Sequence, residues 1–87
     1  MRYRDLTNSE MEVDAVQWTG DRNHFQANCP TSEWEWGTAY PGVPPMVRGR
    51  VVSLNWYVVV YARPARVDQI QFMEPHMFSA TYEQVPE

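Results

Sequence analysis

The sequence predicts a small α+β protein with a curled, mainly antiparallel sheet of about five strands and one or two short helices. The first observation is a set of short segments rich in β-branched and aromatic residues, separated by glycine and proline. The second is a pair of short segments that begin with helix-capping signals. The third is length, because 87 residues make a single domain, 1–87, with no room for a second.

Residues 12–21 (EVDAVQWTGD) predict a central strand. Val16 and Trp18 lie on one face of this strand, and Val13 and Ala15 lie on the other. Because both faces are apolar, the strand is expected near the centre of the sheet. The Thr-Gly-Asp sequence at its end is a turn signal.

Residues 21–30 (DRNHFQANCP) predict a helix of about two turns. Asp21 is a suitable N-cap, because its side-chain oxygen can accept a hydrogen bond from a free backbone N–H. Phe25 and Cys29 are four residues apart and therefore share one side of the helix. Pro30 ends the helix, and a helix this short is stable only when it packs against the rest of the protein.

Residues 31–40 (TSEWEWGTAY) contain an alternation of glutamate and tryptophan. Trp34 and Trp36 point to one side and the glutamates to the other, which is typical of a half-buried antiparallel strand. Residues 41–45 (PGVPP) contain three prolines and a glycine, so we expect a stiff loop with no regular structure there.

Residues 46–52 (MVRGRVV) and 55–62 (NWYVVVYA) predict two strands with a turn at residues 53–55, because one strand across both would be unusually long. The second strand has two faces, one with Trp56, Val58, Val60 and Ala62 and the other with Tyr57, Val59 and Tyr61. The Arg-Pro sequence at residues 63–64 breaks it, and residues 66–72 (RVDQIQF) predict another strand.

The last segment, residues 74–85 (EPHMFSATYEQV), predicts a second short helix followed by extended chain. Pro75 suits the first turn of a helix, where its missing N–H costs nothing. The residues expected to face the core from this helix are Met77, Phe78, Thr81 and Tyr82.

The net charge is −4, which disfavours broad binding to nucleic acid or anionic membranes. Residues 5–36 contain seven acids and one arginine. Residues 37–67 contain no acid and four arginines, which are Arg48, Arg50, Arg63 and Arg66. This asymmetry is typical either of a binding face or of two halves that pair across one sheet, and the second explanation is the simpler.

Residues with catalytic or metal-binding chemistry do not form a recognisable motif. Cys29 is the only cysteine, so no internal disulfide is expected, as is usual in a reducing compartment. His24, His76 and Cys29 lack the spacing of zinc sites, and His24 and Cys29 do not share a helix face. There is no glycine-rich phosphate loop and no apolar signal or membrane segment. We therefore expect a non-enzymatic protein without a metal or cofactor.

Twelve aromatic residues among 87 are more than a core of this size can bury. Trp18, Trp56, Phe72, Phe78 and Tyr82 are expected in the core, with the Tyr82 hydroxyl bonded to a backbone group. Tyrosine, tryptophan and arginine dominate protein-binding hot spots. The predicted contact surface therefore consists of Tyr57, Tyr61, Arg48, Arg50, Arg63 and Arg66, with Trp34, Trp36 and Tyr40 as a second candidate patch.

Three segments together resemble a family of small bacteriophage proteins of uncharacterised function. They are Val-x-Ala-Val-Gln-Trp-Thr-Gly at residues 13–20, the element around Trp56, and Pro-x-x-Phe-x-x-Thr-Tyr-Glu at residues 75–83. This chain has Ser-Leu-Asn before Trp56 where the family has Pro-Gly-Asp, and Glu74 where the family has lysine. The resemblance implies a phage accessory protein and brings no catalytic residue with it.

These observations predict a phage accessory protein that binds a host or phage macromolecule, most simply a protein, in the host cytoplasm. One alternative is a structural virion protein of the head or tail, or a homo-oligomer that buries the same rings. The second alternative is a protein that binds single-stranded nucleic acid. The net negative charge makes nucleic acid the less favoured partner, and no membrane partner is expected.

Overall fold

The computed structural model describes residues 2–36, 43–63 and 65–85, with the backbone alone for residues 63 and 65–68. The elements along the chain are β1 (Arg2–Asp5), β2 (Glu12–Gln17), α1 (Arg22–Asn28), β3 (Trp34–Trp36), β4 (Pro45–Val47), β5 (Arg50–Val51), β6 (Tyr57–Arg63), β7 (Ala65–Met73), α2 (Pro75–Thr81) and β8 (Tyr82–Gln84). The fold is therefore α+β, as the sequence predicted, and most of the regular structure is strand.

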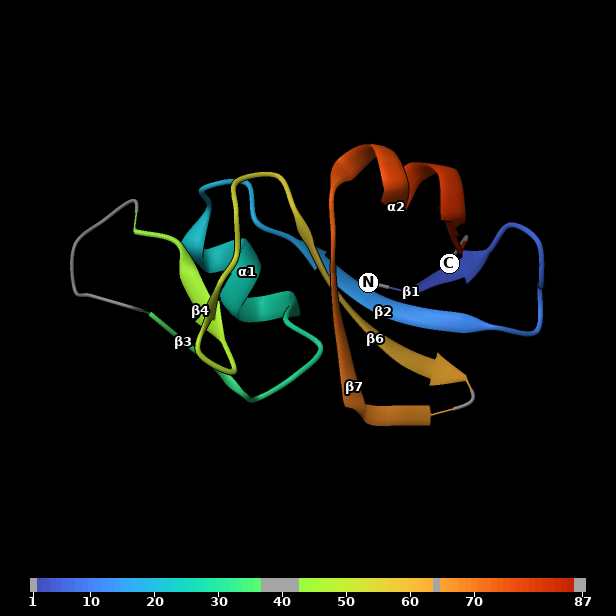
Figure 1. Cartoon of the computed structure of the whole chain (residues 1–87), viewed down its shortest axis with the longest axis horizontal. Helices are drawn as coiled ribbons and strands as arrows, with labels where there is room; N and C mark the ends of the chain where they lie inside the picture. The colour runs from blue at the N-terminus through green and yellow to red at the C-terminus, as the bar shows by residue number, and fades with distance from the viewer. Residues whose placement is uncertain (1, 37–42, 64, 86–87) are drawn as a thin grey trace.

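The strands form two antiparallel sheets. The larger has the order β7-β6-β2-β1-β8, and the smaller has the order β3-β4-β5. β2 is the middle strand of the larger sheet, which confirms the central strand predicted from its two apolar faces. The molecule is elongated, 40 × 23 × 22 Å, with α1 and the smaller sheet at one end and α2 at the other (Figure 1).

Two hydrophobic clusters lie on opposite faces of β2 and β6, because neighbouring residues of a strand point to opposite sides. Cluster 1, beneath α1 and the smaller sheet, contains buried Val16, Trp18, Phe25, Val47, Val52 and Val58, with Cys29, Trp34, Trp36, Trp56, Ile70 and Phe72 packed against them. Cluster 2, beneath α2, contains buried Val13, Ala15, Val59, Phe78 and Tyr82, with Tyr3, Tyr57, Tyr61 and Met73 packed against them. The two faces predicted for residues 56–61 are thus confirmed.

Both helices begin where the sequence predicted. Asp21 caps α1 by accepting a hydrogen bond from the His24 backbone N–H at 3.1 Å. Pro75 occupies the first turn of α2, and Phe78 is buried. Met77 was expected to face the core, but its side chain is 55% exposed, because the face of α2 that carries Phe78 is the one that reaches the sheet. Within the described residues, no helix has the length and apolar character needed to cross a membrane.

The segment predicted as one strand over residues 46–52 is a hairpin of β4 and β5. Arg48 and Gly49 both have positive φ, 50° and 77°, which is typical of the tight two-residue turns that join antiparallel strands. Val47 therefore lies opposite Arg50. Pro45, expected in an irregular loop, begins β4, where the missing N–H of a proline at the start of a strand is tolerated.

The turn between the two sheets lies where it was predicted, and the larger sheet holds it in place. Within the turn, the Trp56 N–H donates to the carbonyl of Ser53 at 3.1 Å. The Trp18 N–H donates to the Trp56 carbonyl at 3.0 Å, and the Gln17 side chain donates to the Asn55 carbonyl at 2.9 Å. The loop that presents Leu54 is therefore attached to the end of β2.

The first strand, β1, was not predicted. It pairs with β2 and also with β8, so it joins the two ends of the chain in one sheet. Its sequence, RYRD, has a single apolar side chain, and no turn signal of the usual hairpin type precedes β2. Tyr3 is the residue that ties this strand to cluster 2.

Candidate protein-binding surface

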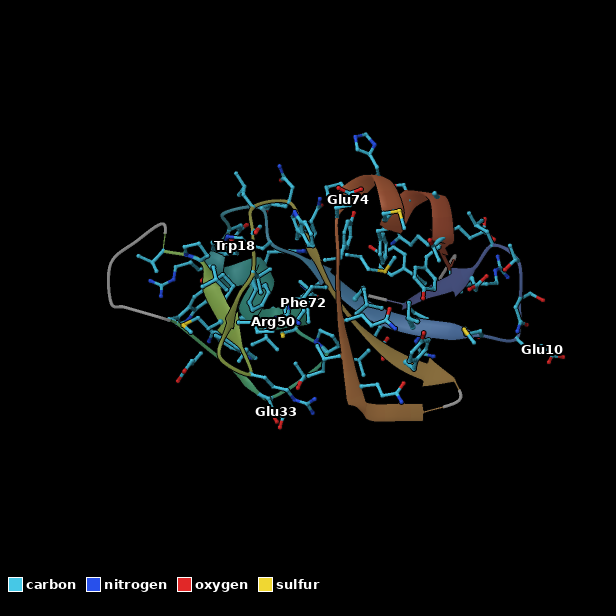
Figure 2. All side chains as sticks on the ribbon, viewed as in Figure 1. Glu10, Trp18, Glu33, Arg50, Phe72 and Glu74 are labelled. Carbon is cyan, nitrogen blue, oxygen red and sulfur yellow. The ribbon has the colours of Figure 1, made fainter. Side chains whose placement is uncertain are left out.

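Arg50, an arginine of the predicted contact surface, lies against an aromatic ring. Its guanidinium carbon is 5.0 Å from the centre of the Phe72 ring. The β4–β5 turn aims Arg50 toward the core-facing side of the smaller sheet, on which Trp34 and Val47 also lie in register. The two labelled side chains lie together between the smaller sheet and β7 (Figure 2). This contact therefore bridges the two sheets.

Exposed apolar side chains follow Arg50 closely in the sequence. Val51 and Leu54 are each 60% exposed, and both follow Arg50 within four residues. Because Val51 is the neighbour of Arg50 in β5, the two side chains point to opposite faces of the strand. A partner that lies along the outer edge of β5 would contact both. We call Arg50, Val51, Leu54 and Phe72 the β5 surface.

Arg48 was predicted to lie on the same contact surface as Arg50, but its side chain pairs with Glu33. The Arg48 Nε donates to a Glu33 carboxylate oxygen at 2.6 Å, and the Arg48 backbone N–H donates to the Glu33 carbonyl at 3.0 Å. This pair joins the acidic and basic halves of the chain, as the simpler explanation of the charge asymmetry expected. Both side chains are largely exposed, so the pair contributes little to stability.

The other described ion pairs form within or between the ends of the chain. Arg2 pairs with Asp14 at 2.8 Å and with Glu12 at 3.1 Å, and Arg4 pairs with Glu83 at 3.1 Å. Some of the acids in the first half of the chain therefore pair with an arginine that precedes them in the sequence. Within the described part of the chain, Arg50 forms no ion pair with any acid.

Tyr57 and Tyr61 do not share a surface with Arg50, although the sequence suggested that they would. Both tyrosines are half-buried and pack against cluster 2, whereas Phe72 and Arg50 lie on the cluster 1 side. The Tyr57 ring stacks on Phe78, with centroids 3.8 Å apart and planes 7° apart. The alternation that put the tyrosines on one face is therefore right, but α2 covers that face.

The hydroxyl groups of cluster 2 bond mainly to side chains. Gln71 donates from its amide nitrogen to the Tyr61 hydroxyl at 3.1 Å. Burial, followed by the nearby Tyr61 and Asp5, raises the pKa of Tyr82 to about 12. Within the described residues, the backbone hydrogen bond that the sequence predicted for the Tyr82 hydroxyl is not found. The Tyr61 hydroxyl therefore has its hydrogen-bond partner inside the protein.

The second candidate patch is partly built into cluster 1. Trp34 and Trp36 are half-buried, and their ring centres are 5.1 Å apart. Both rings also contact Phe25, at 5.6 and 5.8 Å. The Arg22 guanidinium lies 4.1 Å from the centre of the Trp36 ring. Tyr40, the third member of this patch, lies outside the described residues.

Two further arginines of the predicted surface are described by backbone alone. Arg63 ends β6, and its Cα pairs with Glu12. Arg66 pairs with Tyr61 across the β6–β7 hairpin. The side chains of Arg63 and Arg66 lie outside the described part of the structure, so the β5 surface is defined without them.

Cys29 packs against cluster 1 as a small, partly buried side chain. Burial raises the pKa of its thiol, with a smaller opposing effect from a backbone hydrogen bond at Thr31. A raised pKa keeps the sulfur protonated at neutral pH, the opposite of what a nucleophilic cysteine requires. Among residues 2–36, 43–63 and 65–85, no three His, Cys, Asp or Glu side chains gather at one point suited to a metal ion.

Sequence reasoning missed two members of the surface and two contacts. Val51 was assigned to a continuous strand, and Leu54 was treated only as part of a turn. Phe72 was assigned to the core, which its packing against cluster 1 confirms, but its contact with Arg50 was not predicted. Arg22 carried a weak signal, because an arginine in the first turn of a helix is unfavourable beside the positive end of the helix dipole. The Arg22 guanidinium lies over Trp36 because α1 packs against β3, and no residue spacing in the sequence predicts that packing.

Comparisons with known proteins give no relative: no family model matches the chain, and no match is found among the curated proteins or the solved structures.

Proposed function

We propose that this protein is a non-enzymatic phage accessory protein that binds a host or phage protein in the infected cell through the β5 surface. The main support for the proposal is the Arg50 guanidinium over Phe72, together with the exposed side chains of Val51 and Leu54, which follow Arg50 within four residues. Arginine held on a ring next to exposed aliphatic groups combines the features of protein-binding hot spots.

The chemistry of this surface suits a carboxylate beside an apolar side chain. A guanidinium that rests on a ring keeps its N–H donors for hydrogen bonds, and these donors match the two oxygens of a carboxylate. Val51 and Leu54 would lose water on contact with an apolar group of the partner. A partner segment aligned with the short outer edge of β5 would use both faces of that strand.

A protein partner suits the charge better than nucleic acid does. The chain has a net charge of −4, and the β5 surface contains one arginine, whereas nucleic-acid surfaces gather many positive groups along a groove. The phage origin and the site of action in the infected cell rest on the sequence resemblance at residues 13–20, 56 and 75–83.

The test is capture from a lysate of infected host cells with tagged protein in three forms: wild type, Arg50→Gln with Leu54→Ser, and a matched control. The control is Arg2→Gln with Leu6→Ser, which makes the same chemical changes at an exposed arginine and an exposed leucine near β1. All three forms should have the same circular dichroism and melting temperature within a few degrees.

We expect wild type and the control variant to retain the same partner, and the β5-surface variant to lose it. Equal retention by both variants would reject the β5 surface as the contact site. A wild-type eluate without any protein above background would reject the binding function itself. Stoichiometric recovery of the chain from purified virions would favour the structural alternative.

A further inference from the structure

Four strands lie at the edges of the two sheets, and β7 is the least protected of them. An exposed edge presents unpaired backbone groups, which proteins commonly shield by keeping the strand short or charged. β3 and β8 have three residues each and β5 has two, and each contains a charged residue: Glu35, Glu83 and Arg50. β7 has nine residues, and its two charged residues, Arg66 and Asp68, precede residues 69–73 (QIQFM), which carry no charge.

The backbone of this segment is regular and has free groups on its outer side. Residues 70–73 pair in unbroken register with β6, whereas the irregularity of this hairpin lies before Ile70. Within the described residues, residues 69–73 make no backbone hydrogen bonds beyond the pairing with β6. The strand crosses the middle of the molecule as a long extended segment that leads up to α2 (Figure 1).

We propose that the outer edge of β7 pairs with β7 of a second copy of this chain, antiparallel and centred on Gln71. A two-fold axis through this point places Gln71 opposite Gln71 of the second copy and Ile70 opposite the second copy's Phe72. Gln69 then lies opposite the second copy's Met73. The larger sheet continues across the axis from one copy into the other.

The segment is complementary to itself in this register. Ile70 and Phe72 share the cluster 1 side of the sheet, so two isoleucine–phenylalanine pairs join cluster 1 of one copy to cluster 1 of the other. The two Gln71 amides meet on the opposite side, and residues 69–73 bring no like charges into opposing positions. The same operation on β8 or β3 would place Glu83 or Glu35 opposite its own copy, which is repulsive.

This dimer does not rest on the proposed function, although Phe72 belongs to both surfaces, so a partner at the β5 surface and a second copy at β7 would compete for it. Self-association is measured from the mass of the purified protein alone, whereas partner binding is measured by capture. Either can fail while the other holds.

The test introduces a charged side chain at the proposed two-fold axis. Sedimentation velocity over a range of concentrations should show wild type rising from a monomer of 10.2 kDa toward twice that mass. Gln71→Lys and Gln71→Glu each place two like charges opposite one another, and each should weaken association about tenfold or more. An equimolar mixture of the two variants should associate again, because opposite charges then meet. Gln84→Lys, the same change on the exposed side of β8, should associate as wild type does.

The rescue in the mixture also shows that both variants fold, although Gln71 loses its bond to Tyr61. A wild type that stays monomeric at every concentration would overturn the proposal. So would association of Gln71→Lys at the wild-type concentration, or a mixture of the two variants that remains monomeric.

Discussion

Clusters 1 and 2 pack against opposite faces of the same two strands, β2 and β6, but they satisfy their polar atoms differently. In cluster 2 the aromatic residues are mainly tyrosines, and the Tyr61 hydroxyl accepts a hydrogen bond from the Gln71 side chain. In cluster 1 they are tryptophans and phenylalanines, and arginine guanidinium groups cover exposed ring faces. Cluster 2 therefore has its polar partner inside the protein, whereas the outer rings of cluster 1 lie against arginine guanidinium groups.

Aromatic content alone therefore does not locate a binding surface. Tyrosines can complete a core when their rings stack and their hydroxyls find partners, as Tyr57 and Tyr61 do beneath α2. An exposed guanidinium on a ring, such as that of Arg50, keeps donors that another molecule can use, whereas the Nε of Arg22 is buried and has no hydrogen-bond partner within the described residues. The margin of cluster 1 at β5 combines such a group with exposed Val51 and Leu54.

Removing the central ring of each cluster gives the largest expected effect. Phe25→Ala and Phe78→Ala should each lower the free energy of unfolding by about 3–5 kcal/mol, because both rings are buried and contact several other rings. Urea unfolding followed by tryptophan fluorescence and circular dichroism checks this. A loss below about 1 kcal/mol for Phe25→Ala would show that α1 and the three tryptophans are not held by this ring.

Alkaline pH should lower the stability of the protein through Tyr82 in cluster 2. The pKa of Tyr82 is about 12 in the folded protein, against 10.0 for a free tyrosine. Its contribution is fully present below pH 10 and is lost as the pH rises toward 12, because the unfolded chain then ionises first. We expect about 1–2 kcal/mol of stability to be lost over this interval.

Tyr82→Phe is the control for this effect. It removes the ionisable group, so its stability should fall less between pH 10 and 12 than that of wild type. Identical pH dependence of unfolding in the two proteins would contradict the assignment to Tyr82.

The β4–β5 turn, which sets the place of Arg50, can be tested separately. Gly49 has a φ of 77°, and open space surrounds the position of an added Cβ. Gly49→Ala should therefore destabilise the protein by about 1 kcal/mol through backbone strain alone, and Gly49→Asn by less, because asparagine tolerates this conformation. Thermal unfolding of both variants measures the difference. Equal stability of Gly49→Ala and wild type would exclude this turn.

The smallest effect is expected at the exposed Arg48–Glu33 pair. Arg48→Gln should change the free energy of unfolding by less than about 1 kcal/mol, because both side chains face solvent. Addition of salt should reduce even this difference. A larger, salt-insensitive loss in urea unfolding would show that Arg48 is part of the packed structure.

Regular features of the fold were predictable where a local rule decides the outcome. Alternation gave both faces of β6, and capping signals gave the start of each helix at Asp21 and Pro75. The β4–β5 hairpin was missed because Arg-Gly is a weaker turn signal than Asn-Gly. β1 was missed because its pairing with β8 joins residues from opposite ends of the chain.

The candidate site was predicted less well, because it depends on contacts between elements. Arg50 was identified from the charge pattern, but its contact with Phe72 requires the smaller sheet to lie beside β7. Tyr57 was on the right face of its strand, yet nothing local shows that α2 covers that face. Strand alternation defines a face, and only the packing of other elements decides whether the face is free.

The most direct test of the β5 surface is the affinity of the captured partner for purified protein, measured by calorimetry. Arg50→Gln with Leu54→Ser should bind at least about tenfold more weakly than wild type, as expected for a hot spot. Arg2→Gln with Leu6→Ser should bind as wild type does. Equal affinities for the two double variants would contradict the assignment of binding to the guanidinium-bearing margin of cluster 1.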